Sequence, residues 1–209
     1  MRIGKAALGL AAALAMGLAG GAQATTLADL NGGASLTVGS LTFSNFTITV
    51  TGSADPNLAD YTVLSLASGF RIVGGVAAFN AEQGDVSVSY TVSDSAGVDG
   101  ASLGFNGAAV GTHSGATVSE DLSSSGNPIA SALVFQLGSG ASQKTDSVSF
   151  APETSFTVDK NMLVKADANG LATLSFVDQQ FAVVPEPGSL ILFSSGLMGL
   201  LAFGRKRKS

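Results

Sequence analysis

The chain of 209 residues contains no cysteine and no tryptophan, and it has a single histidine, His113. Without cysteine it can form no disulfide, no thiol nucleophile and no cysteine-ligated metal site. A segment of about 160 residues can still bury close to 70% of its unfolded surface without such cross-links. With no tryptophan and two tyrosines, phenylalanine is the main large side chain available for a core.

Basic residues are also scarce, except at the two ends of the chain. Six of the ten Lys and Arg residues lie among the first five or the last five residues. The segment 25–184 therefore holds four basic and fourteen acidic residues, a net charge of −10. Because nucleic-acid binding depends on neutralising phosphates, a surface this acidic argues against a nucleic-acid partner.

The N-terminus has the order of features typical of a secretory signal peptide. Two basic residues precede an Ala- and Leu-rich run over residues 6–19, and Ala22 and Ala24 then form an A-x-A cleavage site. We therefore predict that residues 1–24 are a signal peptide with a helical core. Signal peptidase is the expected partner, and export is the expected fate of the chain that begins at Thr25.

Alternation with a period of two dominates residues 25–183. In VSVSYTV, the apolar side chains of Val86, Val88, Tyr90 and Val92 share one phase, which predicts a half-buried strand. Turn-forming residues in GDVS, SDSAGVDG, SSSGNP and DANG separate such runs. The further strands are predicted over 41–50, 61–66, 70–79, 101–105, 116–122, 132–137, 146–150, 155–164 and 171–183.

Short strands divided by turns at this spacing predict an all-β fold. We expect one antiparallel β-sandwich, of jelly-roll or immunoglobulin-like type, over residues 25–183. It is flanked in this prediction by an N-terminal signal helix and a C-terminal transmembrane helix. The phase of LTFSNFTITV changes near Ser44–Asn45, which predicts a β-bulge. The glycines of Gly74–Gly75, Gly104 and Gly107 suggest bulges or close strand packing rather than a phosphate loop.

The tail, residues 184–209, has a composition of its own. Pro185 and Pro187 disfavour helix, so the Pro-Glu-Pro triplet is expected to be extended and exposed. Residues 188–204 carry no charge, and as a helix they would rise about 26 Å, the lower limit for a membrane span. The basic residues Arg205, Lys206, Arg207 and Lys208 follow directly, and the positive-inside rule then places the C-terminus in the cytoplasm.

These features together resemble the PEP-CTERM sorting signal of Gram-negative bacteria. The resemblance covers about the last 25 residues and lies in Pro185, Glu186 and Pro187, the apolar run and the basic cluster. It implies that exosortase, a membrane protease or transpeptidase, recognises the Pro-Glu-Pro motif at residues 185–187. It also implies transient anchoring in the inner membrane, followed by a place at the cell surface or in an extracellular matrix of exopolysaccharide or biofilm.

Candidates for catalysis or metal binding are few. His113 could be the base of a Ser-His-Asp triad, but no serine lies in a recognisable nucleophile setting, and we interpret His113 as a turn residue. Asp94 and Asp99 flank a glycine-containing loop, and Glu120 and Asp121 are adjacent in a predicted strand. No calcium-loop pattern contains them, so we interpret them as solvated carboxylates. We expect no catalytic residue, no cofactor and no metal site.

Two hypotheses for function remain. The favoured one is a non-enzymatic surface or matrix protein associated with exopolysaccharide. The alternative is a carbohydrate-binding module or a polysaccharide-acting enzyme on the same scaffold, because a glycosidase-type carboxylate pair could come from distant positions. Sugar sites commonly offer exposed aromatic rings, and here the two tyrosines are Tyr61 and Tyr90, the latter predicted to face the core.

Overall fold

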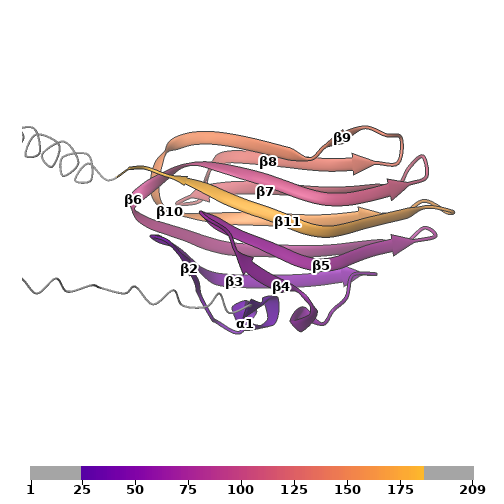
Figure 1. The fold of residues 1–209 in the computed structure, drawn as a ribbon, viewed down its shortest axis with the longest axis horizontal. Coiled ribbons are helices and arrows are strands. Elements are labelled where there is room, and N and C mark those ends of the chain that lie inside the picture. Colours follow the sequence, from indigo (N-terminus) through magenta and orange to yellow (C-terminus); the bar gives the residue numbers. More distant parts are fainter. Residues whose placement is uncertain (1–24, 186–209) are drawn as a thin grey trace, which may run out of the picture.

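The computed structural model describes residues 25–185 (Figure 1). The predicted signal helix and the predicted transmembrane helix lie outside the described residues. Among residues 25–185, no helix is both long and apolar enough to span a membrane.

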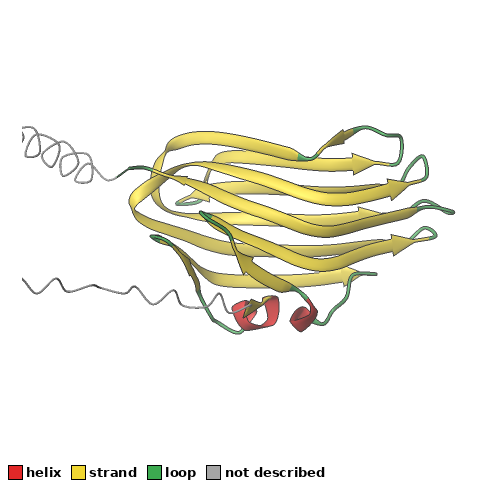
Figure 2. Ribbon diagram, viewed as in Figure 1, coloured by secondary structure: helices red, strands yellow, loops and turns green. Residues whose placement is uncertain are grey.

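Almost all of the described chain is extended, and two short helical segments lie on one side of it (Figure 2). The elements are β1 (Thr25–Thr26), α1 (Leu27–Asn31), β2 (Leu36–Val38), β3 (Leu41–Gly52), η1 (Leu58–Asp60), β4 (Thr62–Ser65), β5 (Gly69–Phe79), β6 (Gln83–Val110), β7 (Gly115–Ser124), β8 (Asn127–Leu137), β9 (Ser142–Gln143), β10 (Thr145–Lys165) and β11 (Leu171–Val183).

Hydrogen bonds join all eleven strands into one sheet, and this sheet is folded into two layers. The first layer contains β2, β3, residues 83–93 of β6, residues 155–165 of β10, β7 and β8. The second contains β1, β4, β5, β11, residues 98–110 of β6 and residues 145–149 of β10. The long strands β6 and β10 thus pass from one layer to the other. Every strand pair among residues 25–185 is antiparallel, which confirms the predicted all-β antiparallel fold.

Aromatic side chains from the two layers meet in the core. The ring of Phe43 in β3 lies 5.1 Å from that of Phe70 in β5, and Phe156 in β10 lies 5.8 Å from Phe181 in β11. Tyr90 is buried among these rings, as its phase in the sequence predicted. This packing defines the interior of the sandwich.

The segment SDSAGVDG was predicted as a loop between strands, and this prediction is wrong. Residues 93–100 continue β6 and carry it from the first layer to the second. Gly97 adopts a positive φ of 94° at this bend, a conformation that favours glycine. The GDVS segment also lies within β6, and the turn precedes it at Asn80 and Ala81, both of which have positive φ. Turn-forming residues here bend a strand without ending it.

The predicted irregularities in β3 and β5 are confirmed. The register of β3 against β6 shifts between Ser44 and Thr47, and Asn45 has a φ of 56°. In β5, Gly74 and Gly75 lie opposite a single residue of β11, which makes a β-bulge. A Cβ at Gly74 would lie 2.3 Å from the ring of Tyr61, so the close packing here requires glycine.

The helix α1 was not predicted. Its first turn carries a capping box, in which Asp29 N donates to Thr26 Oγ1 at 3.2 Å and Thr26 N donates to Asp29 Oδ2 at 2.9 Å. Leu27 and Leu30 are completely buried, so the helix covers one edge of the core. The T-x-x-D spacing was the sequence signal for this helix.

Candidate functional site

Of the predicted sorting and processing residues, Pro185 alone lies in the described part of the chain. It is exposed and follows the end of β11 by two residues, and Val184 N donates to Gly97 O at 2.9 Å. Ala22, Ala24, Glu186, Pro187, Arg205, Lys206, Arg207 and Lys208 lie outside the described residues. At the other end, Thr25 pairs with Val63 of β4. Both predicted processing regions therefore border the folded domain directly.

His113 lies in an exposed turn between β6 and β7, as predicted. Its backbone N donates to Asp167 Oδ2 at 3.3 Å. Within residues 25–185, no group of three or more His, Asp and Glu side chains is placed to hold a metal ion.

The interpretation of Asp94 and Glu120 as solvated carboxylates is wrong. Asp94 is 4% exposed, and its Oδ1 accepts from Ala96 N at 2.8 Å. Its Oδ2 is buried and has no hydrogen-bond partner in the part of the chain that the structure describes. Glu120 is 1% exposed. Both side chains take the inward phase of their strands, which directs them away from water.

Glu120 belongs to a polar cluster inside the sandwich, together with Lys160 and Gln179. We call these three residues the buried trio. Glu120 in β7 and Lys160 in β10 are register partners in the first layer, and Gln179 extends from β11 in the second. Lys160 Nζ lies 2.5 Å from Glu120 Oε2 and donates to Gln179 Oε1 at 2.6 Å. Gln179 Nε2 donates to Glu120 Oε1 at 3.2 Å. The trio forms a closed ring of hydrogen bonds between the two layers.

The electrostatics of the trio follow from its burial. The side chains of Lys160 and Glu120 have no exposed surface, and Gln179 is also fully buried. Desolvation lowers the pKa of Lys160 from its usual value, and the charge of Glu120 opposes this shift. A buried ion pair of this kind stabilises weakly, because the lost hydration offsets the attraction of the charges.

The sequence contained a signal for the trio that our interpretation did not use. Lys160 lies at a core-facing position of β10, between the buried residues Val158 and Met162. Glu120 likewise lies at a core-facing position of β7, between the buried residues Val118 and Leu122. Gln179 occupies the apolar phase of β11. Polar residues at core positions of three strands, with one positive and one negative charge among them, were evidence for a buried cluster.

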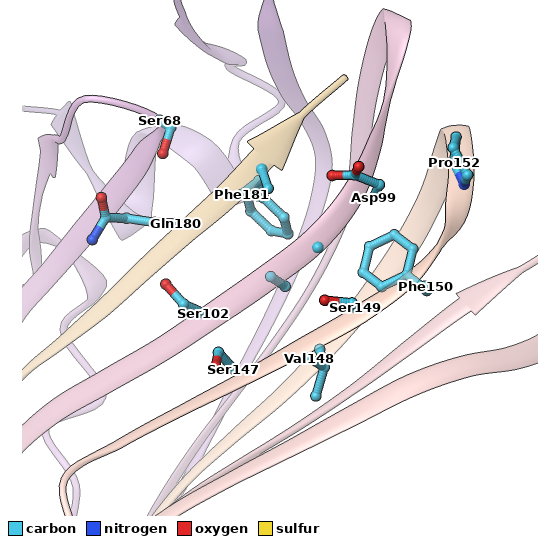
Figure 3. Close-up of a pocket in the computed structure, with 13 residues that line it drawn as sticks. Ser68, Asp99, Ser102, Ser147, Val148, Ser149, Phe150, Pro152, Gln180 and Phe181 are labelled. Carbon is cyan, nitrogen blue, oxygen red and sulfur yellow. The ribbon is translucent and has the colours of Figure 1, made fainter. Parts of the chain in front are cut away.

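A second site lies on the outer face of the second layer. Two adjoining hollows of about 520 and 440 Å³ share Ser102, Ser147 and Gln180. We call them together the sheet groove. It is lined by residues 99–104 of β6, residues 145–150 and Pro152 of β10, Asp178 and residues 180–182 of β11, and Ser68. The close-up shows side chains of the larger hollow arriving from these three strands (Figure 3).

Hydrogen-bonding side chains cross the groove floor in a row. Ser102 of β6 is the register partner of Gln180 on one side and of Ser147 on the other. On either side of Ser102, Gly100 and Gly104 have no side chain, so the groove is deeper along β6 than along the neighbouring strands β10 and β11. The groove thus offers hydroxyl and amide groups to an extended polar ligand.

The charges at the groove are acidic, and none of the described residues that line it is Lys or Arg. Asp178 is bound by Arg71, which reaches it with two hydrogen bonds of 2.5 and 2.7 Å. Asp146 accepts from Leu133 N at 2.9 Å. Asp99 is therefore the lining carboxylate that is available to a ligand, and an anionic ligand would be repelled.

Comparison with known families identifies the tail. Residues 183–208 match the model described as the PEP-CTERM protein-sorting motif. The chain carries a PEP-CTERM sorting motif. The motif implies that the protein is an exosortase substrate and is exported to the cell surface. No curated protein matches the chain.

Solved structures similar to this chain share little sequence with it. The module TmCBM61, solved with β-1,4-galactotriose, is 15% identical with a TM-score of 0.36, over 65% of this chain and 88% of that one. CsCBM6-3 from Clostridium stercorarium, solved with cellobiose, is 14% identical with a TM-score of 0.26, over 64% and 86%. A family two carbohydrate esterase from Clostridium thermocellum is 13% identical with a TM-score of 0.24, over 68% and 34%. Likenesses this distant carry no argument about function.

Proposed function

We propose that this protein is an exported, non-enzymatic component of the cell surface or extracellular matrix, and that its β-sandwich binds exopolysaccharide in the sheet groove. The observation that carries the proposal is the row formed by Gln180, Ser102 and Ser147 across three strands. Such a row presents donors and acceptors to successive hydroxyl groups of an extended glycan. The PEP-CTERM motif supplies the route that brings the groove to the outside of the cell.

The groove favours a neutral or positively charged glycan. It carries Asp99 and is lined by no described Lys or Arg, and residues 25–185 have a net charge of −10, from four basic and fourteen acidic residues. Phe150 and Phe181 both line the groove, and because Phe181 is buried, the half-buried Phe150 is the ring that a sugar can contact in part. With little stacking, binding rests on hydrogen bonds and is expected to be weak for each site. Many copies on one polymer would then raise the avidity.

The proposal includes a non-enzymatic role because the trio is closed to an external substrate. Glu120 and Lys160 form an ion pair, and their side chains have no exposed surface. A polysaccharide in the sheet groove lies on the opposite face of the second layer from Gln179, because Gln180 faces outward. The groove therefore binds rather than cleaves in this proposal.

Retention on immobilised exopolysaccharide tests the groove. Ser147→Arg places a long side chain in the groove, and we expect it to reduce retention by at least about tenfold, the effect of about 1.4 kcal/mol. Ser131→Arg makes the same change of size and charge at an exposed position of β8 outside the groove, and it should bind as the wild type does. Equal losses in the two variants, or no retention of the wild-type protein, would show that the groove is not the glycan site.

The fate of the tail forms the second part of the proposal. Residues 188–204 hold the chain in the inner membrane for a time, with Arg205–Lys208 in the cytoplasm, until exosortase acts near Pro187. The exposed position of Pro185, two residues beyond β11, supports access to the motif at its N-terminal side. Mass spectrometry of protein from membrane, surface and medium fractions should find mature chains that begin at Thr25 and end near Pro187. Intact C-terminal peptides on mature, cell-attached protein would contradict processing.

A further inference from the structure

The buried trio contains more than an ion pair, because the amide of Gln179 contacts both Lys160 and Glu120. A charged pair in a sandwich interior gains little stability over apolar side chains of the same size. Here the lysine amine contacts both a carboxylate and a side-chain amide, at 2.5 and 2.6 Å, and the carboxylate contacts that same amide at 3.2 Å. An amine, an amide and a proton carrier thus lie in mutual contact, away from water. We propose that Lys160 and Gln179 become joined by an isopeptide bond within the folded domain, with Glu120 as the proton carrier.

Lys160 is placed as the nucleophile of this reaction. Its Nζ touches Gln179 Oε1, which holds the amine against the amide group whose carbon it must attack. An amine attacks a carbonyl carbon only through its neutral form, and desolvation lowers the pKa of Lys160. The two side chains come from strands of opposite layers, and folding alone brings them together. Contact within one molecule replaces the encounter of two reactants.

Glu120 is the catalytic residue in this proposal because its two oxygens contact the two groups that exchange protons. Oε2 accepts from the attacking Lys160 Nζ, and Oε1 accepts from Gln179 Nε2, the nitrogen that leaves. The carboxylate can take a proton on one side and deliver a proton on the other.

The step balances without any further reactant. Glu120 removes a proton from the ammonium group of Lys160, and Nζ then forms a bond with Cδ of Gln179. The bond between Cδ and Nε2 breaks, and Nε2 leaves as ammonia with a proton from Glu120. One of the two protons left on the attacking nitrogen then passes to Glu120, and the new amide keeps the other. The products are a neutral amide, ammonia and a protonated Glu120. Two buried charges become none, which removes the cost of keeping them out of water.

The bond would link β10 of the first layer to β11 of the second. In an exported chain that has no cysteine, it would serve as the covalent tie that a disulfide supplies elsewhere. The reaction occurs once in each molecule and is independent of the groove, so it goes beyond the proposed function and would hold whether or not the groove binds a glycan.

Mass spectrometry of the full-length protein, purified in its folded state and then denatured and digested with trypsin, tests the bond. A joined Lys160 is not cleaved, so residues 145–165 should appear as one peptide attached to the peptide that begins at Ala166. The combined mass should be lower by about 17 Da, the ammonia lost when the amine displaces the amide nitrogen. Peptides 145–160 and 161–165 that are free, together with an unmodified peptide from Ala166, would overturn the proposal.

A pair of variants tests the role of Glu120. Glu120→Gln keeps the size of the side chain and removes the proton carrier, so bond formation should slow by at least about 100-fold, the lower range of general acid–base catalysis. Asp121→Asn makes the same change at the neighbouring exposed residue and should form the bond as the wild type does. A Glu120→Gln protein that becomes linked at the wild-type rate would overturn the assignment of Glu120. If Glu120→Gln does not fold, the peptide masses of the wild-type protein still decide whether the bond exists.

Discussion

Tyr90→Phe should stabilise this protein, although it removes a polar group from a tyrosine that is 99% buried. The hydroxyl of Tyr90 has no hydrogen-bond partner within the described part of the chain, while the residue is 1% exposed. A buried hydroxyl without a partner costs about 1–3 kcal/mol relative to its hydration in the unfolded chain. The ring contacts remain in the variant, including the stacking on Phe46 at 5.2 Å. We expect the free energy of unfolding to rise by about 1–2 kcal/mol after allowance for the small void.

Tyr61→Phe is the matched control, because the chain has two tyrosines and both are 1% exposed. Tyr61 differs in that its hydroxyl donates to Asp55 O at 3.0 Å. Loss of this bond should lower the free energy of unfolding by about 0.5–1.5 kcal/mol. Urea denaturation monitored by circular dichroism measures both changes, and calorimetry should show Tm shifts of about 2–4 °C for each kcal/mol. Shifts of the same sign in the two variants would refute the assignment of an unsatisfied hydroxyl at Tyr90.

The same residue predicts a loss of stability at alkaline pH. Burial, and then the charge of Glu120, raise the pKa of Tyr90 well above 10.0. An unfolded chain releases this proton near pH 10, whereas the folded protein keeps it, so the free energy of unfolding should fall as the pH rises above 10. The slope contributed by one such group is about 1.4 kcal/mol per pH unit. Tyr90→Phe should lack this contribution, and equal alkaline slopes in wild type and variant would contradict the reasoning.

Two further comparisons test the packing of β5. Gly74→Ala should lower the free energy of unfolding by about 1–3 kcal/mol, because the new Cβ would lie 2.3 Å from the buried ring of Tyr61. Gly75→Ala is the control: its Cβ would meet nothing within 4 Å, so urea denaturation should give a free energy of unfolding within about 0.5 kcal/mol of the wild type. Arg71→Ala should lower the free energy of unfolding only slightly, because the side chains of the Arg71–Asp178 pair are 34% and 23% exposed and water screens their attraction. The loss should shrink in 1 M salt. An Arg71 effect that salt does not change would indicate packing rather than charge.

The sequence predicted those elements whose causes are local. The bounds of the strand at 171–183 agree with β11, because strand-forming residues run from the DANG turn to Val184, although the register shifts between Leu174 and Phe176. The bulge at Asn45 was visible as a change of phase within one strand. The Ser-Gly turn between β7 and β8 was visible as well, and Ser125 and Gly126 both have positive φ there.

What depends on the pairing of distant strands could not be predicted in the same way. A period of two shows which side chains share a face, but it does not show which layer a strand joins. For this reason residues 93–100, where β6 crosses from one layer to the other, were predicted as a loop. The sheet groove combines residues near 100, 147 and 180, which no local pattern connects. The trio was partly visible, since Lys160 broke an apolar phase, but its partners lie on two other strands.

The position of β11 has a mechanical consequence. The chain leaves the domain toward its sorting motif at Val184, directly from a strand that is hydrogen-bonded to β5 on one side and to β6 on the other. A pull on the C-terminus is therefore resisted by two ladders together and cannot peel a strand from an open edge. A protein held at a surface by this end would transmit shear from flowing water into the middle of its sheet.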